Sequence, residues 1–342
     1  MRRYTHLAIT VAGLLRFGQV FGLSDSHSLK NNTSVAWWVT GTALQAVCDY
    51  MYISGDTKYL SMAEYTVNAQ SGPLAWWPEG NGDFRADSTD DTGWWALALV
   101  RMYDLTGNRT YLDIAQLDEA YIYSYWNTWT CNGGVIWDIP DLTYKNAISN
   151  ELYMKLAASL HNRIPGDTEY LGKAVAEWDW FVQSGMINSD SLVNDGLTDD
   201  CVNNGETEWS YNQGVILGAA AELYKATQNV SYLDTATAIA NAVLASPVLS
   251  PNGILTEYGC EPADCDNDQQ AFKGIFGRNL AELNILLADR PFSAYLASNV
   301  ASVGANDEVD GFFGISWAGP YSNATIGTQA SVVSLLVANV WQ

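Results

Sequence analysis

The chain has 342 residues, 48% of them hydrophobic and 16% charged, which is enough to build a large core in one domain or two. Sixteen basic and 38 acidic residues give a net charge of −22, and so acidic a surface repels phosphate backbones, which argues against nucleic-acid binding. The chain has fourteen tryptophans and nineteen tyrosines, and aromatic rings can stack on the C–H faces of a sugar. Most large aromatic side chains in any protein nevertheless belong to the core.

The N-terminal segment has the pattern of a secretion signal. Arg2 and Arg3 precede a mostly apolar run from 7 to 15, and small and polar residues follow by Ser24. We therefore predict a signal over 1–23. Sequons for N-glycosylation support export. They begin at Asn31, Asn32, Asn108, Asn229 and Asn323.

A seven-residue phrase that ends in Tyr-Leu recurs four times, each time between two helical runs, at 54–60, 106–112, 165–171 and 227–233. The tyrosines of successive copies are 52, 59 and 62 residues apart, the span of two helices and two loops. Helical hairpins of this kind must stack to bury their apolar faces. Dividing roughly 320 residues by about 53 gives about six hairpins, so we predict an all-α (α/α)6 toroid. The repeated phrases would lie at one end of it and the loops between them at the other.

Asp90 and Asp91 stand at the start of a helical run that carries Trp94 and Trp95. Ser88 or Thr89 can cap this helix, and acids in a first turn interact well with the helix dipole. A capping role is therefore one interpretation of the pair. The alternative is catalytic, since glycosidic bond cleavage needs two carboxyl groups that act together. This stretch alone leaves both interpretations open.

Five cysteines leave at least one without an intramolecular partner. Cys260 and Cys265 would close a short loop and are the best candidates for a disulfide. Cys131 and Cys201 both lie in loop-like sequence and could pair, whereas the helical pattern around Cys48 predicts a buried thiol.

The chain has only three histidines and no C-x-x-C pair, which gives little support for a zinc site. We expect neither a metal nor another cofactor.

Three further polar segments, 142–151, 208–214 and 266–274, enter predicted helices in the same phase of the repeat. Any one of them could serve only as a cap. Together they would line one rim with amides, carboxylates and indoles, groups that bind and stack on sugars.

The C-terminal stretch 326–341 is apolar but short, so we expect a buried closing helix there. We expect no segment long enough to span a membrane.

Three motifs in combination resemble those of glycoside hydrolase family 76, at 89–98, 144–151 and 209–214. The resemblance extends from about residue 35 to 284 and implies an (α/α)6 toroid with α-1,6-mannanase activity. Carried over to this chain, it implies that Asp90 is the nucleophile and Asp91 the general acid/base of a retaining mechanism. The candidate substrate-binding residues are Trp37, Trp38, Trp94, Trp95, Trp137, Lys145, Asn146, Asn150, Trp209, Tyr211, Asn212, Gln213, Asp268 and Lys273.

The chemistry of adjacent carboxyl groups agrees with this assignment. Retaining enzymes hold their two carboxyl groups about 5–5.5 Å apart, which side chains on Cα atoms about 3.8 Å apart can reach. Mutual repulsion also helps to keep one of the two protonated.

The leading hypothesis is a secreted, monomeric, endo-acting α-1,6-mannanase that acts on α-mannan through a covalent intermediate, with residues 24–342 as one catalytic domain outside the cell or at its wall. One alternative is a cell-wall transglycosidase that acts on the mannose of glycosylphosphatidylinositol anchors, since the family resemblance includes such enzymes. Thr89 before the pair and Thr92-Gly93-Trp94 after it are closer to the hydrolases. Another alternative is a non-catalytic mannan-binding protein, against which the intact aspartate pair argues.

Overall fold

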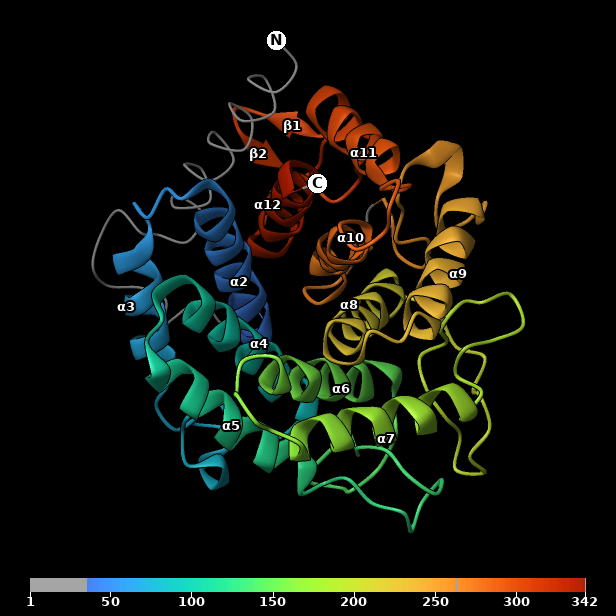
Figure 1. Ribbon diagram of the computed structural model, residues 1–342. Coiled ribbons are helices and arrows are strands. Elements are labelled where there is room, and N and C mark those ends of the chain that lie inside the picture. Colours follow the sequence, from blue (N-terminus) through green and yellow to red (C-terminus); the bar gives the residue numbers. More distant parts are fainter. Residues whose placement is uncertain (1–35, 263, 342) are drawn as a thin grey trace.

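The computed structural model describes residues 36–262 and 264–341, and this part of the chain is a ring of helices (Figure 1). Each inner helix packs against the next, and the last packs against the first, so the inner ring is closed. The inner helices are α2 (Trp37–Ser54), α4 (Thr89–Thr106), α6 (Ala147–His161), α8 (Ser210–Thr227), α10 (Gln269–Asn284) and α12 (Ile326–Trp341).

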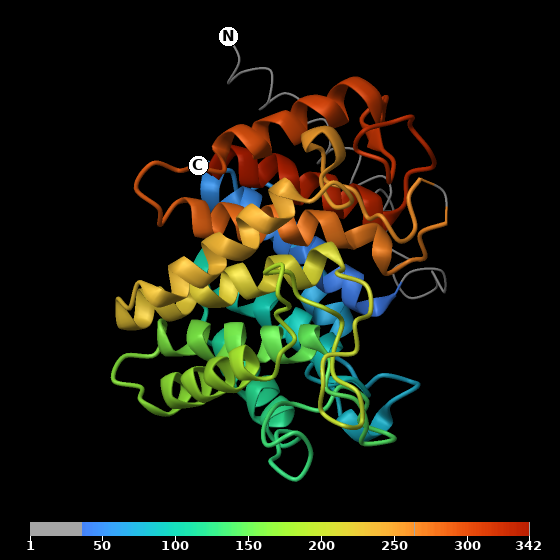
Figure 2. The same cartoon turned by 90° about the vertical axis from the view of Figure 1, so that its right-hand side faces the viewer.

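An outer layer of helices alternates with the inner ones along the chain, as Figures 1 and 2 show. Helices α5, α7 and α9 each pack on the inner helix that precedes them, whereas α11 packs mainly on α12. The predicted all-α toroid of helical hairpins is therefore confirmed. The outer helices are α3 (Leu60–Gln70), α5 (Arg109–Tyr123), α7 (Glu169–Gln183), α9 (Ser231–Ala245) and α11 (Ser293–Asn306).

Strands and 3-10 turns are short in the described residues. Two turns, η2 (Pro78–Gly80) and η3 (Pro251–Gly253), lie in loops. Strands β1 (Glu308–Val309) and β2 (Phe312–Phe313) form one antiparallel hairpin in which Glu308 pairs with Phe313.

The repeated Tyr-Leu phrases connect inner helices to outer ones. Gly55 and Gly107 end α2 and α4 with left-handed φ angles of 72° and 69°, and each donates its N–H to a carbonyl of the last helical turn. Gln228 ends α8 in the same conformation, with a φ of 58°. All these turns lie at the C-terminal end of the inner helices, so the opposite end is left for the loops that carry the polar motifs.

The two layers differ in how they are buried. Inner helices are buried around most of their circumference, whereas outer helices such as α7 bury one stripe, formed there by Ala174, Glu177, Trp178 and Phe181. The inner ring also encloses charged groups. Lys155 Nζ lies 2.6 Å from a Glu282 carboxylate oxygen.

Both predicted disulfides, Cys131–Cys201 and Cys260–Cys265, are present, and Cys48 is a buried free thiol whose pKa is raised by burial.

The predicted signal over 1–23 lies outside the described residues. Among the described helices, none combines the length and apolarity that a membrane crossing requires. The sequon residues Asn108, Asn229 and Asn323 are exposed, as the attachment of a glycan requires.

Candidate active site

A cleft with a volume of about 1170 Å³ opens at the end of the ring where the inner helices begin. The first turn of each inner helix, or the residue before it, contributes to the lining. The rest of the wall comes from the segment 69–76 and from single residues of the loops. Residues that line the cleft at the six helix starts are Trp37, Asp90, Asn146, Tyr211, Gln269 and Ile326.

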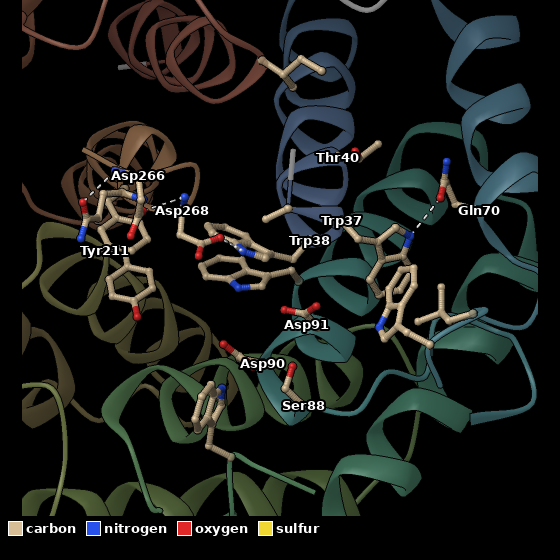
Figure 3. Close-up of a pocket in the computed structure, with 18 of the residues that line it drawn as sticks. Trp37, Trp38, Thr40, Gln70, Ser88, Asp90, Asp91, Tyr211, Asp266 and Asp268 are labelled. Carbon is tan, nitrogen blue, oxygen red and sulfur yellow. Dashed lines mark hydrogen bonds between the residues drawn. The ribbon is translucent and has the colours of Figure 1, made fainter. Parts of the chain in front are cut away.

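Asp90 and Asp91 lie in the first turn of α4, are half-buried, and point into this cleft (Figure 3). Ser88 occupies the N-cap position, but its side chain caps no N–H group of α4. The hydroxyl of Thr89 is also engaged elsewhere, since it donates to the carbonyl of Ile136 at 2.9 Å. One oxygen of Asp90, Oδ1, has no hydrogen-bond partner. The pair is therefore available for chemistry in the cleft.

The two carboxyl groups have different electrostatic surroundings. Burial raises the pKa of Asp90 to about 6, although the Ser88 hydroxyl, nearby backbone N–H groups and the Trp137 indole favour its ionised form. The pKa of Asp91 is raised well above its ordinary value, first by burial and then by the negative charges of Asp90 and its neighbours. At neutral pH the proton of the pair therefore resides mainly on Asp91. One carboxylate and one carboxylic acid then face the cleft together.

Aromatic rings form the wall on one side of the aspartates. Trp38 stacks on Trp94 with ring centroids 5.1 Å apart and donates its indole N–H to Asp268 at 2.7 Å. Tyr211 stacks on Phe272 at 3.8 Å. Figure 3 shows Trp38, Tyr211 and Asp268 on this side of the pair.

The opposite wall is formed by the start of α2 and the segment after α3. The Trp37 indole donates to Gln70 Oε1 at 2.9 Å, and both residues lie across the cleft from Tyr211 (Figure 3). Trp76 packs edge-on against Trp37 and remains 54% exposed, which leaves its ring free to stack on a ligand.

The structure brings most of the predicted site residues to the cleft and leaves the others outside it. Asn146 and Trp209 reach the cleft from the N-cap positions of α6 and α8. Besides the aspartate pair, the predicted residues that line the cleft are Trp37, Trp38, Trp94, Trp137, Asn146, Trp209, Tyr211 and Asp268. Those that do not line it are Trp95, Lys145, Asn150, Asn212, Gln213 and Lys273.

Three of the residues outside the cleft belong to the core or to buried polar contacts. Trp95 is fully buried and stacks on Phe84 with centroids 4.7 Å apart. The Lys145 ammonium donates to backbone carbonyls of the 127–133 loop, including Thr130 at 2.7 Å. Lys273 is buried in an ion pair with Glu261.

The amides outside the cleft hold the loops that surround it. Asn150 accepts from the backbone N–H of Val135 at 2.6 Å and donates to its carbonyl at 3.2 Å. Gln213 makes the same pair of bonds to Val193, at 2.8 and 2.7 Å. Asn212 is fully buried, and its side-chain atoms have no hydrogen-bond partner. Asn150 and Gln213 thus each use both ends of the amide to hold the backbone of a loop.

Tyr144 and Asp195 line the cleft and were not among the predicted site residues. Tyr144 stands directly before Lys145 and Asn146 in the motif that resembles the family, so its position in that motif could have predicted it as a site residue. Asp195 lies in an irregular loop after α7, where no periodic pattern singles it out. In the described part of the chain, no group of three or more histidine, cysteine, aspartate or glutamate side chains could hold a metal ion.

Comparison with known proteins assigns the family. The family model described as Glycosyl hydrolase family 76 matches residues 13–342, and the chain therefore belongs to glycosyl hydrolase family 76.

Two curated yeast proteins show the extent of similarity within the family. A Schizosaccharomyces pombe protein provisionally named a mannan endo-1,6-alpha-mannosidase is 32% identical over 294 residues, which cover 80% of this chain and 63% of that protein. The mannan endo-1,6-alpha-mannosidase DFG5 of Saccharomyces cerevisiae is 29% identical over 266 residues, covering 73% of this chain and 57% of the yeast protein. The chain thus spans about 57–63% of the length of these relatives.

Solved structures share the toroid over almost the whole chain. The Lin0763 protein of Listeria innocua is 26% identical with a TM-score of 0.82, covering 97% of this chain and 96% of that one. The GH76A α-1,6-mannanase of Salegentibacter sp. HEL1_6 is 24% identical, also with a TM-score of 0.82, covering 97% and 98%. At 24% identity, the similarity to the Salegentibacter enzyme shows a shared fold and nothing more.

Proposed function

We propose that this chain is a secreted endo-α-1,6-mannanase that hydrolyses α-mannan with retention of configuration. The observation that carries the proposal is the Asp90–Asp91 pair, two adjacent carboxyl groups that point together into an aromatic cleft and whose pKa values are both raised, that of Asp91 also by the charge of Asp90. The names of the yeast relatives support the substrate. A further support is an inactive variant of the Salegentibacter enzyme, with two consecutive aspartates replaced by asparagine, solved with α-1,6-mannotriose.

In the first step the Asp90 carboxylate attacks the anomeric carbon of the sugar, and the bond from that carbon to the glycosidic oxygen breaks. The bonding electrons pass to the leaving oxygen, which takes the proton of Asp91. The result is a covalent glycosyl ester on Asp90 and a carboxylate on Asp91. The raised pKa of Asp91 suits the acid that donates this proton.

In the second step a water molecule enters where the leaving sugar stood. The Asp91 carboxylate takes a proton from this water as its oxygen attacks the anomeric carbon. The ester bond breaks, Asp90 regains its negative charge, and Asp91 is again protonated. Each step inverts the configuration of the anomeric carbon, so the product has the same configuration as the substrate.

The disposition of the cleft supports endo action. Potential binding groups lie on both sides of the aspartates, with Trp37 and Gln70 on one side and Tyr211 and Asp268 on the other (Figure 3). A polysaccharide could therefore be held both before and after the bond that is cleaved.

The pH dependence of kcat/KM is expected to be bell-shaped. Activity rises through an apparent pKa of about 6 as the nucleophile ionises, and falls at higher pH when Asp91 loses its proton. The charge of Asp87 contributes to the raised pKa of Asp91, so Asp87→Asn should move the alkaline limb to lower pH. Initial rates on α-1,6-mannan across the pH range measure both limbs. An alkaline limb that stays in place in Asp87→Asn would contradict the assignment of the acid.

Product analysis tests hydrolysis against transglycosylation. Incubation with α-1,6-mannan should give shortened mannan whose new reducing ends are initially α, and the same products should form when a β-glucan acceptor is added. Mannosyl-glucan adducts would instead identify a transglycosidase with the same covalent intermediate. Initial β products would overturn the retaining mechanism, and a failure to turn over any mannan would leave only a binding function.

Export and domain organisation are part of the same proposal. Residues 24–342 would form one catalytic domain after removal of the signal at 1–23. The two disulfides suit an oxidising compartment. Sequencing the N-terminus of the exported protein checks the cleavage site, and size-exclusion chromatography checks the expected monomer.

A further inference from the structure

Tyr144 is held in an unfavourable backbone conformation at the edge of the cleft. Its φ angle is 64°, in the left-handed region that bulky residues rarely occupy. Such conformations persist where the surroundings fix them, and they concentrate at functional sites. The hydroxyl of Tyr144 donates to the Asp195 carboxylate and accepts from the Asn204 amide at 2.9 Å. Gly196 leaves room for the ring, because a Cβ atom there would lie 2.6 Å from the Tyr144 hydroxyl oxygen.

Tyr144 in turn contacts Trp137 through both backbone and side chain. The backbone N–H of Trp137 donates to the carbonyl of Tyr144 at 2.8 Å. The two rings meet edge to face, with centroids 6.1 Å apart and an interplanar angle of 89°. Trp137 is 36% exposed, so the protein core does not fix its indole on all sides. The contact with Tyr144 therefore restricts which orientations the indole can adopt.

Trp137 reaches the catalytic pair by two connections. Its carbonyl accepts from the backbone N–H of Thr89 at 3.2 Å, which ties the segment to the start of α4. Its side chain lines the cleft together with Asp90 and interacts with that carboxyl group in the sense that favours ionisation. A continuous set of contacts thus runs from the anchored Tyr144 to Thr89, the residue before the nucleophile.

We propose that Tyr144 is a positioning residue that, anchored by Asp195 and Asn204, holds the Trp137 indole against the Asp90 carboxyl group. Its kinetic consequence rests on the proposed function, whereas the contact itself does not. An indole held beside Asp90 in the cleft favours the ionised carboxylate before attack. Asp87 and Asp268 add negative charge near Asp91, and Asp195 and Asp266 line the same cleft.

A double-mutant cycle separates this role from direct substrate binding. Tyr144→Phe keeps the ring and removes the anchoring hydroxyl. It should lower kcat/KM by roughly tenfold, within the usual range for coupled residues, and move the acidic limb of the pH profile to higher pH. In a Trp137→Phe background the same change should have almost no further effect. A full additional loss in that background, or no loss in the wild-type background, would overturn the proposal.

An NMR titration tests the contact without reference to mannan. In protein labelled with ¹⁵N-tryptophan, the indole signal lost in Trp137→Phe is that of Trp137. This signal should titrate with the pKa of Asp90, about 6, and with a higher midpoint in Tyr144→Phe. A pH-independent signal would refute the contact even in an active mannanase. A titrating signal in a protein that does not cleave mannan would refute only the proposed function.

A matched tyrosine serves as the control. The Tyr295 hydroxyl lies 2.7 Å from Ser250 Oγ on the outer layer, and Tyr295→Phe should leave kcat/KM and the pH profile unchanged. If Tyr144→Phe does not fold, as judged by circular dichroism, Asn204→Ala removes the amide bond to the Tyr144 hydroxyl instead and should shift the acidic limb in the same direction. An unshifted limb in that folded variant would overturn the proposal equally.

Discussion

Replacement of Asp90 by asparagine is expected to lower kcat for α-1,6-mannan by about 10⁴-fold or more, the scale of loss when a nucleophile is removed. Asparagine preserves the shape of the side chain but cannot form the ester intermediate. The fold should be unaffected, because Asp90 is half-buried and its Oδ1 atom has no partner to lose. Burial disfavours the Asp90 carboxylate, so its replacement by a neutral amide also removes that cost. Initial rates and thermal melting of the same sample measure the two expectations, and retained turnover would refute the assigned role.

Asp91→Asn is the matched comparison, because it removes the acid and spares the nucleophile. Its loss on mannan should be severe, but an aryl α-mannoside with a good leaving group needs little protonation in the first step. On that substrate the glycosyl-enzyme should accumulate, and added azide should release it as a mannosyl azide. Asp90→Asn should stay inactive on both substrates. Equal behaviour of the two variants would show that the roles are not divided in this way.

Replacement of Lys155 by methionine is expected to destabilise the protein by about 3–5 kcal/mol, the usual cost of leaving a buried charge without its partner. Lys155 lies inside the ring on α6 and bonds both Asn279 at 2.5 Å and Glu282 at 2.6 Å on α10. Burial alone would raise the pKa of Glu282, but Lys155 and other nearby cations hold it below its ordinary value. Without Lys155 the buried Glu282 carboxylate loses its short charge-assisted bond and, among the described residues, keeps only the longer approach of the Arg101 guanidinium at 3.7 Å as an ion pair. Urea denaturation with unchanged m-value gives the free energy of unfolding.

The control for this prediction is an exposed ion pair. Lys58 Nζ lies 3.3 Å from Asp56, and the two side chains are 40% and 39% exposed. Lys58→Met should cost between about 0 and 1 kcal/mol, since water screens such pairs. Equal costs for the two lysines would show that the buried bonds between α6 and α10 contribute no special stability.

The architecture could be predicted because its signals are local. Glycine turns such as Gly55 and Gly107 end helices through backbone conformation, and the spacing of Tyr59, Tyr111 and Tyr170 reports the length of a hairpin. The ring closure between α2 and α12 carries no such signal. It follows from the number of hairpins and from the need to bury the inner helices on all sides.

The site could be predicted by position better than by role. Helix starts predicted the cleft, because parallel inner helices bring their first turns together. The direction of each side chain was beyond a pattern of residue types, so Trp94 lines the cleft while Trp95, one residue later, packs in the core. Lys145 and Gln213 illustrate a related point, because polar groups near a site also satisfy the backbone of its loops.

The parallel inner helices also supply charge that no side chain carries. Each helix end at the cleft bears the equivalent of about half a positive charge on its free N–H groups. Six such ends face five aspartates, and among the described residues that line the cleft there is no lysine, arginine or histidine. The backbone therefore offsets part of the negative potential that these acids create. The cleft therefore offers hydrogen-bond acceptors to a neutral ligand such as a sugar. It offers no cationic side chain among the described residues to bind a phosphate or a carboxylate in its place.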